Sequence, residues 1–164
     1  MITLANYEDH EEIIHVWEQS VRASHAFLTE EYLQEIKSKL PSILQQVKTY
    51  VYRGNEGNIK GFIGIAGHKM EMLFIHPDHF NQQIGSQLAK FCVHSLNVDE
   101  VDVNEQNHTA LRFYEKMGYR PTGRDEIDAL GKPYPILHLK FGGVINATRP
   151  VPNYPSNKYQ LASS

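Results

Sequence analysis

Cysteine is almost absent from this sequence, with Cys92 alone among 164 residues. A single cysteine excludes an intramolecular disulfide and a zinc site built from several thiolates. Because such chains are typical of reducing compartments, we expect a cytoplasmic location. The sequence also lacks an apolar run of the ~20 residues that a membrane-spanning helix needs. Its first residues lack the basic and apolar segments of a secretory signal, so we expect neither secretion nor a membrane partner.

An excess of charge of either sign is missing as well. The chain has 16 Lys and Arg against 19 Asp and Glu, a net charge of −3 and a pI near 6.3. This balance gives no electrostatic reason to expect a nucleic acid as a partner. Apolar residues make up 41% of the chain, which is ordinary for a globular protein, and the length fits one domain with its own core.

Helix and strand patterns alternate along most of the chain. Ile13, Trp17 and Val21 recur at i, i+4 and i+8, as in an amphipathic helix. Thr29 is the expected N-cap of a second helix, which Pro41 is expected to end or kink. The remaining apolar runs are bounded by turn residues and predict strands and two further helices, in the ranges 2–4, 47–54, 59–67, 69–75, 84–96 (helix), 99–104, 108–117 (helix), 119–127 and 133–141.

The order of these elements predicts the fold class. A strand, the helix 84–96 and the next strand form a right-handed crossover, so these two strands should be parallel. The predicted fold is α/β (α+β), a mixed, mostly antiparallel sheet of about seven strands with one parallel central pair and about four helices. We predict one domain over residues 1–141. Residues 142–164 are rich in Gly, Pro, Asn and Ser, which predicts a disordered tail, with a partner-binding arm as the alternative.

The stretch HPDHFNQQIGSQLAKF, residues 76–91, is the first candidate for chemistry. It predicts a strand end, a turn and a helix start, and a helix N-terminus offers N–H groups and partial positive charge to an anion. Gly85 falls in the first helical turn, where a missing side chain lets a ligand approach the backbone. The alternative is that this glycine only allows tight packing.

The stretch NEQNHTALRFYEKMGY, residues 104–119, is the second candidate. It predicts a helix with Asn107 as N-cap and Gly118 just beyond its end. Tyr114 lies two helical turns after Asn107, so both side chains point the same way. A phenol with a pKa near ~10 can donate a proton to a thiolate or an amine. The alternative is an ordinary half-buried aromatic beside Phe113.

Together the two stretches resemble the GCN5-related N-acetyltransferase (GNAT) family. LFIHPDHFNQQIGSQL is similar to its acetyl-CoA motif, and NEQNHTALRFYEKMGYRPTGR is similar to its second motif. The resemblance covers about residues 1–141, and SVRASHAFL and DALGKPYPILHL are similar to the small bacterial YjaB-type branch. It implies the GNAT fold and the transfer of the acetyl group of acetyl-CoA to a primary amine of a small molecule or peptide, by direct attack.

The resemblance also implies roles for individual residues. Asn107 would hydrogen-bond the cofactor near its pantetheine, and Tyr114 would protonate the departing CoA thiolate. The backbone of one strand segment would pair with the pantetheine arm, as an added strand would; its residues are Leu73, Phe74 and Ile75. The N–H groups of the turn and the helix start would hold the pyrophosphate; these residues are Gln82, Gln83, Ile84, Gly85 and Ser86.

The first motif departs from the family pattern at three positions. Phe80 stands where the family has Arg or Gln, and Asn81 and Gln83 stand where it has glycine. If the position of Gln83 requires a positive φ, the strain is ~1–2 kcal/mol. We therefore expect acetyl-CoA binding roughly tenfold weaker than in a relative with all its glycines.

Direct attack needs a base for the amine, and Glu71 is the candidate. By simple alternation Glu71 shares a face with Leu73, although a bulge near Met72 would reverse that phase. A solvated strand carboxylate is the alternative. His25 and His68 are rivals for the base and candidates for binding the acceptor. Tyr134, in GKPYP, is a further acceptor candidate or part of a rigid turn.

Two classes of function remain open from the sequence. The leading one is an acetyl-CoA-dependent N-acetyltransferase without a metal, acting as a monomer or homodimer. The other is a GNAT-fold protein that binds a ligand or partner and catalyses little. Three residues favour the enzyme: Tyr114, Asn107 and Glu71. Three others favour the binder: Phe80, Asn81 and Gln83.

Overall fold

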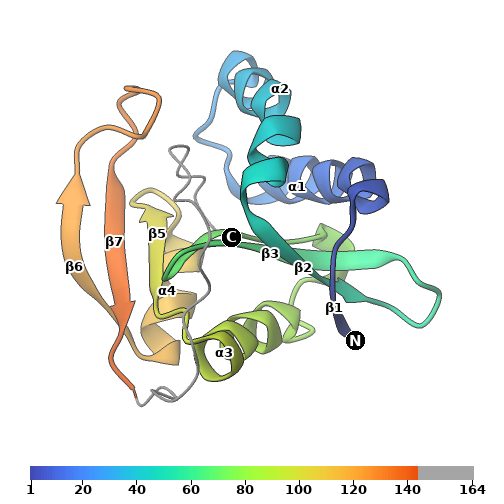
Figure 1. Ribbon diagram of the computed structural model, residues 1–164. Coiled ribbons are helices and arrows are strands. Elements are labelled where there is room, and N and C mark those ends of the chain that lie inside the picture. Colours follow the sequence, from blue (N-terminus) through green and yellow to red (C-terminus); the bar gives the residue numbers. More distant parts are fainter. Residues whose placement is uncertain (144–164) are drawn as a thin grey trace.

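The structure, a computed structural model, describes residues 1–143 (Figure 1). The predicted tail therefore lies outside the described residues, apart from its first two positions. Two short 3-10 turns, Tyr7–Asp9 and Pro77–His79, accompany the main elements. The main elements in chain order are β1 Ile2–Leu4, α1 His10–Ser24, α2 Glu30–Gln46, β2 Lys48–Arg53, β3 Ile59–Ala66, β4 Lys69–Ile75, α3 Ile84–Leu96, β5 Glu100–Asn104, α4 His108–Met117, β6 Tyr119–Asp125 and β7 Ile136–Phe141.

The predicted order of strands and helices is confirmed. The seven strands form one sheet in the order β1-β2-β3-β4-β5-β7-β6. β4 and β5 are its one parallel pair, and the other neighbouring strands are antiparallel. The crossover through α3 places these two parallel strands side by side, as the right-handed rule requires.

The helices cover both faces of the sheet (Figure 1). α1 packs on β3 and β4 from one side, and α3 packs on the same strands from the other. Side chains of β3 alternate between the two cores: Phe62 belongs to the core under α1 and α2, and Ile63 to the core under α3 and α4. The burial of both faces explains why β3 and β4 are apolar along nearly their whole length.

Local signals fix the helix ends. The side chain of Thr29 accepts a hydrogen bond from the N–H of Tyr32 at 3.1 Å, so Thr29 is the N-cap of α2, as predicted. Of the two outcomes expected at Pro41, an end of α2 is wrong, because the helix continues to Gln46, and a kink stays a prediction. Pro41 is exposed. Water can therefore reach the carbonyl that loses its helical hydrogen bond.

β4 contains the bulge that simple alternation leaves out. Gly64 of β3 pairs with Met72 and Ile65 pairs with Met70, so Glu71 has no partner residue on β3. As a result Met70 and Leu73, three residues apart, both lie in the core under α3. The bulge therefore reverses the phase of β4 at Glu71.

Candidate functional site

The site begins where β4 and β5 separate. The ladder between them has two residue pairs, Lys69 with Glu100 and Met70 with Val101. Beyond these pairs the strands diverge, as parallel neighbours do when their ladder ends. The predicted pantetheine segment runs along the β4 side of this opening and is buried; it consists of Leu73, Phe74 and Ile75. Its pairing with a cofactor stays a prediction.

A cleft of about 970 Å³ opens between the N-terminal half of α3 and the length of α4, on the side of Ile75, and we call it the α3–α4 cleft. Its volume lies at the upper end of the range for small-molecule sites. It brings together Ile75, most of the predicted pyrophosphate turn and Asn107. The described residues that line it are Ala23, Ser24, Ile75, His79, Phe80, Asn81, Gln83, Ile84, Gly85, Ser86, Lys90, Asn107, Thr109, Phe113, Lys116 and Met117. The lining does not include Gln82, Leu73, Phe74 or Tyr114.

The turn before α3 keeps a glycine-like backbone without glycines. Asn81 has φ 64° and Gln83 has φ 61°, both in the left-handed region. Asparagine tolerates this region, but for glutamine it costs about 1–2 kcal/mol. Gln83 therefore has the positive φ on which the strain expected from the sequence depends.

Gly85 is not required by the packing of the protein. A Cβ added at Gly85 would lie 3.6 Å from Cζ of Phe113 and 3.8 Å from Cγ1 of Ile75, which are ordinary contacts. Both of these neighbours also line the α3–α4 cleft. A side chain at this position would therefore fill cleft space without disturbing the fold, which fits a site that needs close approach to the start of α3.

Asn107 joins this cleft to α1. Its Oδ1 accepts a hydrogen bond from the N–H of Ala110 at 3.1 Å and so caps α4. This fixes the amide orientation, and Nδ2 then faces Nε2 of His25 at 3.3 Å. The other ring nitrogen of His25, Nδ1, lies 2.8 Å from Oγ of Ser24, whose hydroxyl donates to the carbonyl of Ser20 at 2.7 Å.

The directions of these hydrogen bonds assign the tautomer of His25. An amide Nδ2 can only donate, so Nε2 of His25 accepts. The ring proton then lies on Nδ1 and is donated to Ser24. His25, which is 4% exposed, is thus a neutral ring that orients Asn107. A proton added at Nε2 would place two donors against each other and break this contact.

A second, much smaller hollow lies on the other face of β4, and we call it the Trp17 pocket. Its volume is about 30 Å³, room for one or two water molecules. Phe74 and His25 line it, whereas their neighbours Ile75 and Asn107 line the α3–α4 cleft. The remaining lining residues are Trp17, Val21, Leu28, Tyr32, Ile36, Asn104, Asp128 and Ile136.

Aromatic and acidic side chains close one side of the Trp17 pocket. The hydroxyl of Tyr32 donates to Oδ2 of Asp128, and the ring of Tyr32 stacks on that of Tyr134 with centroids 5.2 Å apart. Burial, and then the hydrogen bond to Asp128, raise the pKa of Tyr32. Tyr134 thus lies beside the pocket, whereas His68 is exposed at the turn between β3 and β4, away from both hollows.

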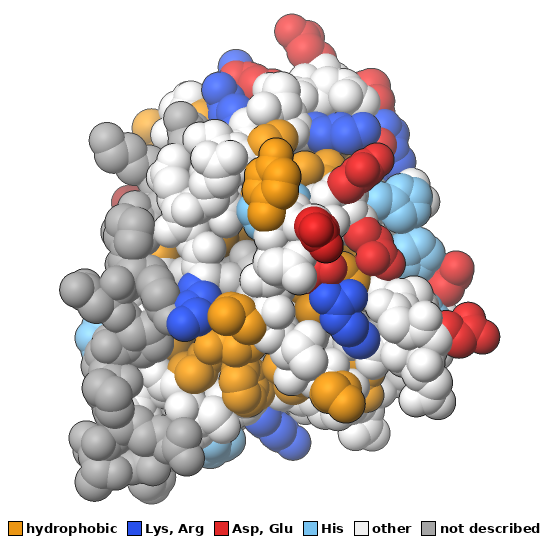
Figure 2. Space-filling view, turned by 45° about the vertical axis from the view of Figure 1, so that its right-hand side comes forward, with side chains coloured by type: hydrophobic (Ala, Val, Ile, Leu, Met, Phe, Trp, Pro, Cys, Tyr) orange, Lys and Arg blue, Asp and Glu red, His pale blue; other side chains and the backbone are white. Residues whose placement is uncertain are grey.

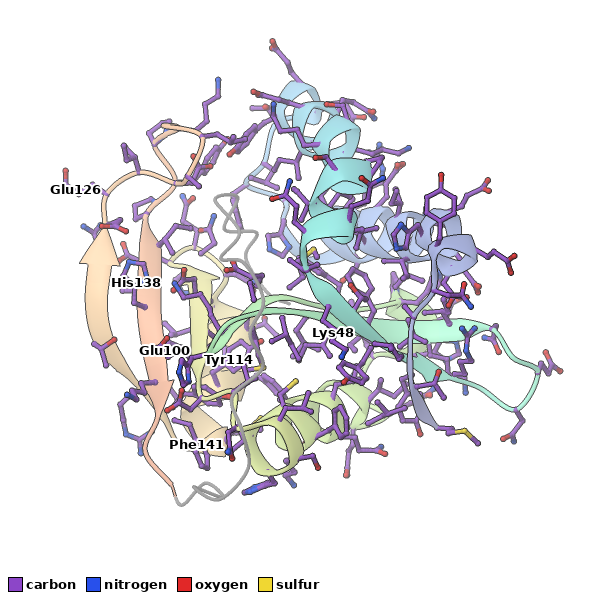
Figure 3. The ribbon with its side chains drawn as sticks, in the orientation of Figure 1. Lys48, Glu100, Tyr114, Glu126, His138 and Phe141 are labelled. Carbon is purple, nitrogen blue, oxygen red and sulfur yellow. The ribbon has the colours of Figure 1, made fainter. Side chains whose placement is uncertain are left out.

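Tyr114 points into the interior of the molecule (Figure 3). The residue is fully buried, and its ring packs edge-on against Phe113 and Tyr119, at centroid distances of 5.0 and 5.3 Å. The spacing from Asn107 is as predicted, but the hydroxyl itself has no solvent-exposed surface. A role in protonating a thiolate therefore stays a prediction.

Glu71 is also buried, at 2% exposure, rather than being a solvated strand carboxylate. The ammonium of Lys69 lies among the carboxylates of Asp102, Glu71 and Glu100. Burial lowers the pKa of Lys69, but these three carboxylates outweigh burial and raise it. The bulge thus places the buried carboxylate of Glu71 where the pairing between β4 and β5 ends.

Sequence reasoning missed a chain of charges that crosses four strands. Nζ of Lys69 lies 3.0 Å from Asp102, which is 3% exposed. The other oxygen of Asp102 lies 2.6 Å from Nδ1 of His138, and Nε2 of His138 lies 2.8 Å from Asp125. Figure 3 shows His138 on β7 and Glu100 on β5. His138, to which the sequence assigned no role, is the centre of this chain.

Two kinds of feature are absent from the part of the chain that the structure describes. Within residues 1–143 no three His, Cys, Asp or Glu side chains are placed to hold a metal ion. None of the helices described is both long and apolar enough to cross a membrane. The face shown in Figure 2 mixes acidic, basic and histidine side chains and presents no continuous basic surface.

The end of β4, the left-handed turn before α3 and the capped start of α4 all line the α3–α4 cleft. The family profile of the acetyltransferase (GNAT) domain matches residues 10–131, so the chain belongs to the GNAT acetyltransferases. It is therefore an N-acetyltransferase that uses acetyl-CoA.

Its relatives confirm the YjaB-type branch. Peptidyl-lysine N-acetyltransferase YjaB of Escherichia coli is 37% identical over 142 residues, which cover 87% of this chain and 97% of YjaB. The YjaB of Salmonella typhimurium is 38% identical over 140 residues, 85% of this chain and 97% of that protein. The solution structure of apo YjaB from Escherichia coli superposes with a TM-score of 0.81 at 36% identity, covering 88% of this chain and 98% of YjaB.

A more distant solved structure agrees in fold. The PaiA N-acetyltransferase of Thermoplasma acidophilum, solved in complex with coenzyme A, superposes with a TM-score of 0.65 at 22% identity. The superposition covers 86% of this chain and 98% of PaiA. The predicted GNAT fold is thus confirmed.

Proposed function

We propose that this acetyltransferase acetylates the ε-amine of a lysine side chain in a peptide or protein. The observation that carries the proposal is that two hollows open on opposite faces of β4 and meet at the contact between His25 and Asn107. Mostly apolar side chains line the Trp17 pocket, and its volume of about 30 Å³ has room for the amine end of an acceptor but not for a whole side chain. Peptidyl-lysine, the acceptor named for YjaB, ends in such an amine.

The α3–α4 cleft fits acetyl-CoA. The first N–H groups of α3 have no helical acceptor and can hold the pyrophosphate. Gly85 leaves the space for close approach, and Asn107 reaches the cleft from the start of α4. Acetyl-CoA supplies the activated acetyl thioester there.

The side chains of this protein would handle the protons. A lysine amine must lose a proton before it attacks, and Glu71 is a buried carboxylate one residue beyond the last β4–β5 pair. Tyr114 would return a proton to the thiolate. Because Tyr114 is buried, the thiol end of the cofactor would have to enter the opening between β4 and β5 to reach its hydroxyl.

A lysine acceptor is testable with matched amines. The protein should acetylate a peptide that has one internal lysine and a blocked N-terminus. Mass spectrometry measures the acetylated product. A peptide with a free N-terminus and no lysine, and a polyamine, should react at least tenfold more slowly. Preference for either of these would replace the lysine acceptor with an N-terminal or small-molecule amine.

The noncatalytic alternative has a separate readout. Phe80, which lines the α3–α4 cleft without a charge where the family has Arg or Gln, is the observation that favours it. Measurable binding of acetyl-CoA without acetylation of any of the three amines would support a binding protein. We also propose a cytoplasmic location, for which the buried thiol of Cys92 is suited, and an assembly no larger than a dimer.

A further inference from the structure

The α3–α4 cleft is positively charged at a place that the family motif does not explain. At position 80, where the family has Arg or Gln, this chain places a phenylalanine that is 37% exposed and lines the cleft. Among the described lining residues the charged side chains are Lys90 and Lys116, and no carboxylate is present. In a chain with a net charge of −3, this is a local reversal of sign.

The two lysines lie on facing helices, away from the pyrophosphate turn. On α3, Ser86 and Lys90 are one turn apart and line the same cleft. Seven residues separate Lys90 from Gln83, a rise of about 10 Å along the helix. On α4, Phe113 and Lys116 share the face toward the cleft, and Lys116 is about 13 Å along the helix from Asn107.

Neither ammonium is neutralised within the described part of the chain. Lys90 and Lys116 are exposed and have no ion pair among residues 1–143. Other lysines are paired, such as Lys37 with Glu18 at 2.8 Å. Glu115, which precedes Lys116 on α4, lines a neighbouring groove that Lys116 also borders, and it makes no ion pair with Lys116. The charge of the two lysines is therefore directed at whatever occupies the cleft.

We propose that Lys90 and Lys116 bind the 3′-phosphate of CoA, an inference that rests on acetyl-CoA being the donor. A phosphate monoester carries about −1.5 to −2 charges at neutral pH. It is the one charged group of CoA beyond the pyrophosphate, which the start of α3 can hold. Lysines bind phosphate as flexible point charges. The protein thus anchors the nucleotide end of its donor through α3 and α4, where the side chain at position 80 contributes no charge.

The test compares the affinity for CoA with that for 3′-dephospho-CoA, which lacks only the 3′-phosphate. Both are measured by calorimetric titration at low salt. The wild-type protein should bind CoA at least tenfold more tightly than dephospho-CoA. Lys90→Ala and Lys116→Ala should each reduce this ratio, and the double variant should abolish it while its affinity for dephospho-CoA is unchanged. Lys116→Arg keeps the charge and should keep the ratio.

The control is Arg112→Ala, on the same helix; Arg112 lines the neighbouring groove with Glu115, Lys116 and Arg120 but does not line the α3–α4 cleft. It should leave the ratio unchanged. Equal affinities of the wild type for the two ligands, or an equal loss for both ligands in the lysine variants, would overturn the assignment of the lysines. If the wild type binds neither ligand at millimolar concentration, the donor itself is wrong, and the inference fails with the proposed function.

Discussion

Nδ2 of Asn107 and Nε2 of His25 lie 3.3 Å apart, although 82 positions separate them in the sequence. The contact links the N-cap of α4 to the end of α1. It also links the two hollows, because Asn107 lines the α3–α4 cleft and His25 lines the Trp17 pocket. His25 thus accepts from the same amide whose Oδ1 caps α4, so both contacts hold the orientation of Asn107.

The first prediction is that His25 and Asn107 act as a unit. His25→Ala and Asn107→Ala should each weaken acetyl-CoA binding by roughly tenfold. The double variant should lose little more than either single variant, because residues in direct contact show non-additive effects. Calorimetric titration of the four proteins measures this coupling. His68→Ala, at an exposed turn, is the control and should bind normally; fully additive losses would mean that the contact does not orient Asn107.

The second prediction concerns Gln83. Because its φ of 61° is present in the free protein, the strain reduces the stability of the fold rather than the affinity for a ligand. Gln83→Gly should therefore raise the free energy of unfolding by about 1 kcal/mol and the melting temperature by a few degrees. Gln82→Gly is the matched control, since Gln82 has no positive φ and glycine there should destabilise. Equal shifts in the two variants would exclude strain at Gln83.

Structural features that depend on residues within one helix or strand could be predicted from the sequence. Asn107 and Gly118 bound α4 as predicted, because capping depends on neighbours within one turn. The element order and the parallel pair followed from periodicity and handedness. Pro41 misled the prediction of α2, because whether a proline ends a helix depends on the surroundings of the carbonyl that loses its bond.

Contacts that depend on the register of distant strands could not be predicted from the sequence. The Lys69–Asp102 and Asp102–His138 pairs join residues 33 and 36 positions apart. They form only because β7 inserts next to β5, with Asp102 opposite His138. Likewise the bulge at Glu71 arises from pairing with β3, and nothing in KMEMLFI alone specifies its position. The lysines of the α3–α4 cleft required the two helices to be placed side by side.

The third prediction is that Tyr114→Phe lowers kcat by roughly 10²-fold while acetyl-CoA affinity is unchanged. The ring and its packing remain, and only the proton donor is lost. Tyr119→Phe is the control, because Tyr119 is equally buried and its hydroxyl has no partner within residues 1–143. Its kcat should be normal. A normal kcat in Tyr114→Phe, with chemistry limiting turnover, would leave Tyr114 as a core residue.

The fourth prediction is that Glu71→Gln removes the acidic limb of the kcat/KM–pH profile. A carboxylate that serves as the base must be ionised, so activity falls as it is protonated at low pH. Glutamine keeps the shape of the side chain but accepts no proton. Glu100→Gln, which also neutralises a carboxylate near Lys69, is the control and should keep the acidic limb. Persistence of that limb in Glu71→Gln would exclude Glu71 as the base.

The last prediction is a pH dependence of stability from His138. Burial lowers the pKa of His138, but its hydrogen bonds to Asp102 and Asp125 outweigh burial and raise the pKa above the ordinary value of 6.5. The protonated ring therefore stabilises the folded protein fully below about pH 6.5, and this contribution is lost as the pH rises through the folded-state pKa. Urea unfolding should give a midpoint that falls across this window. His138→Asn should flatten the fall, and the exposed His68→Asn should not. A midpoint equally pH-dependent in His138→Asn would show that the chain from Lys69 to Asp125 does not couple protonation to folding.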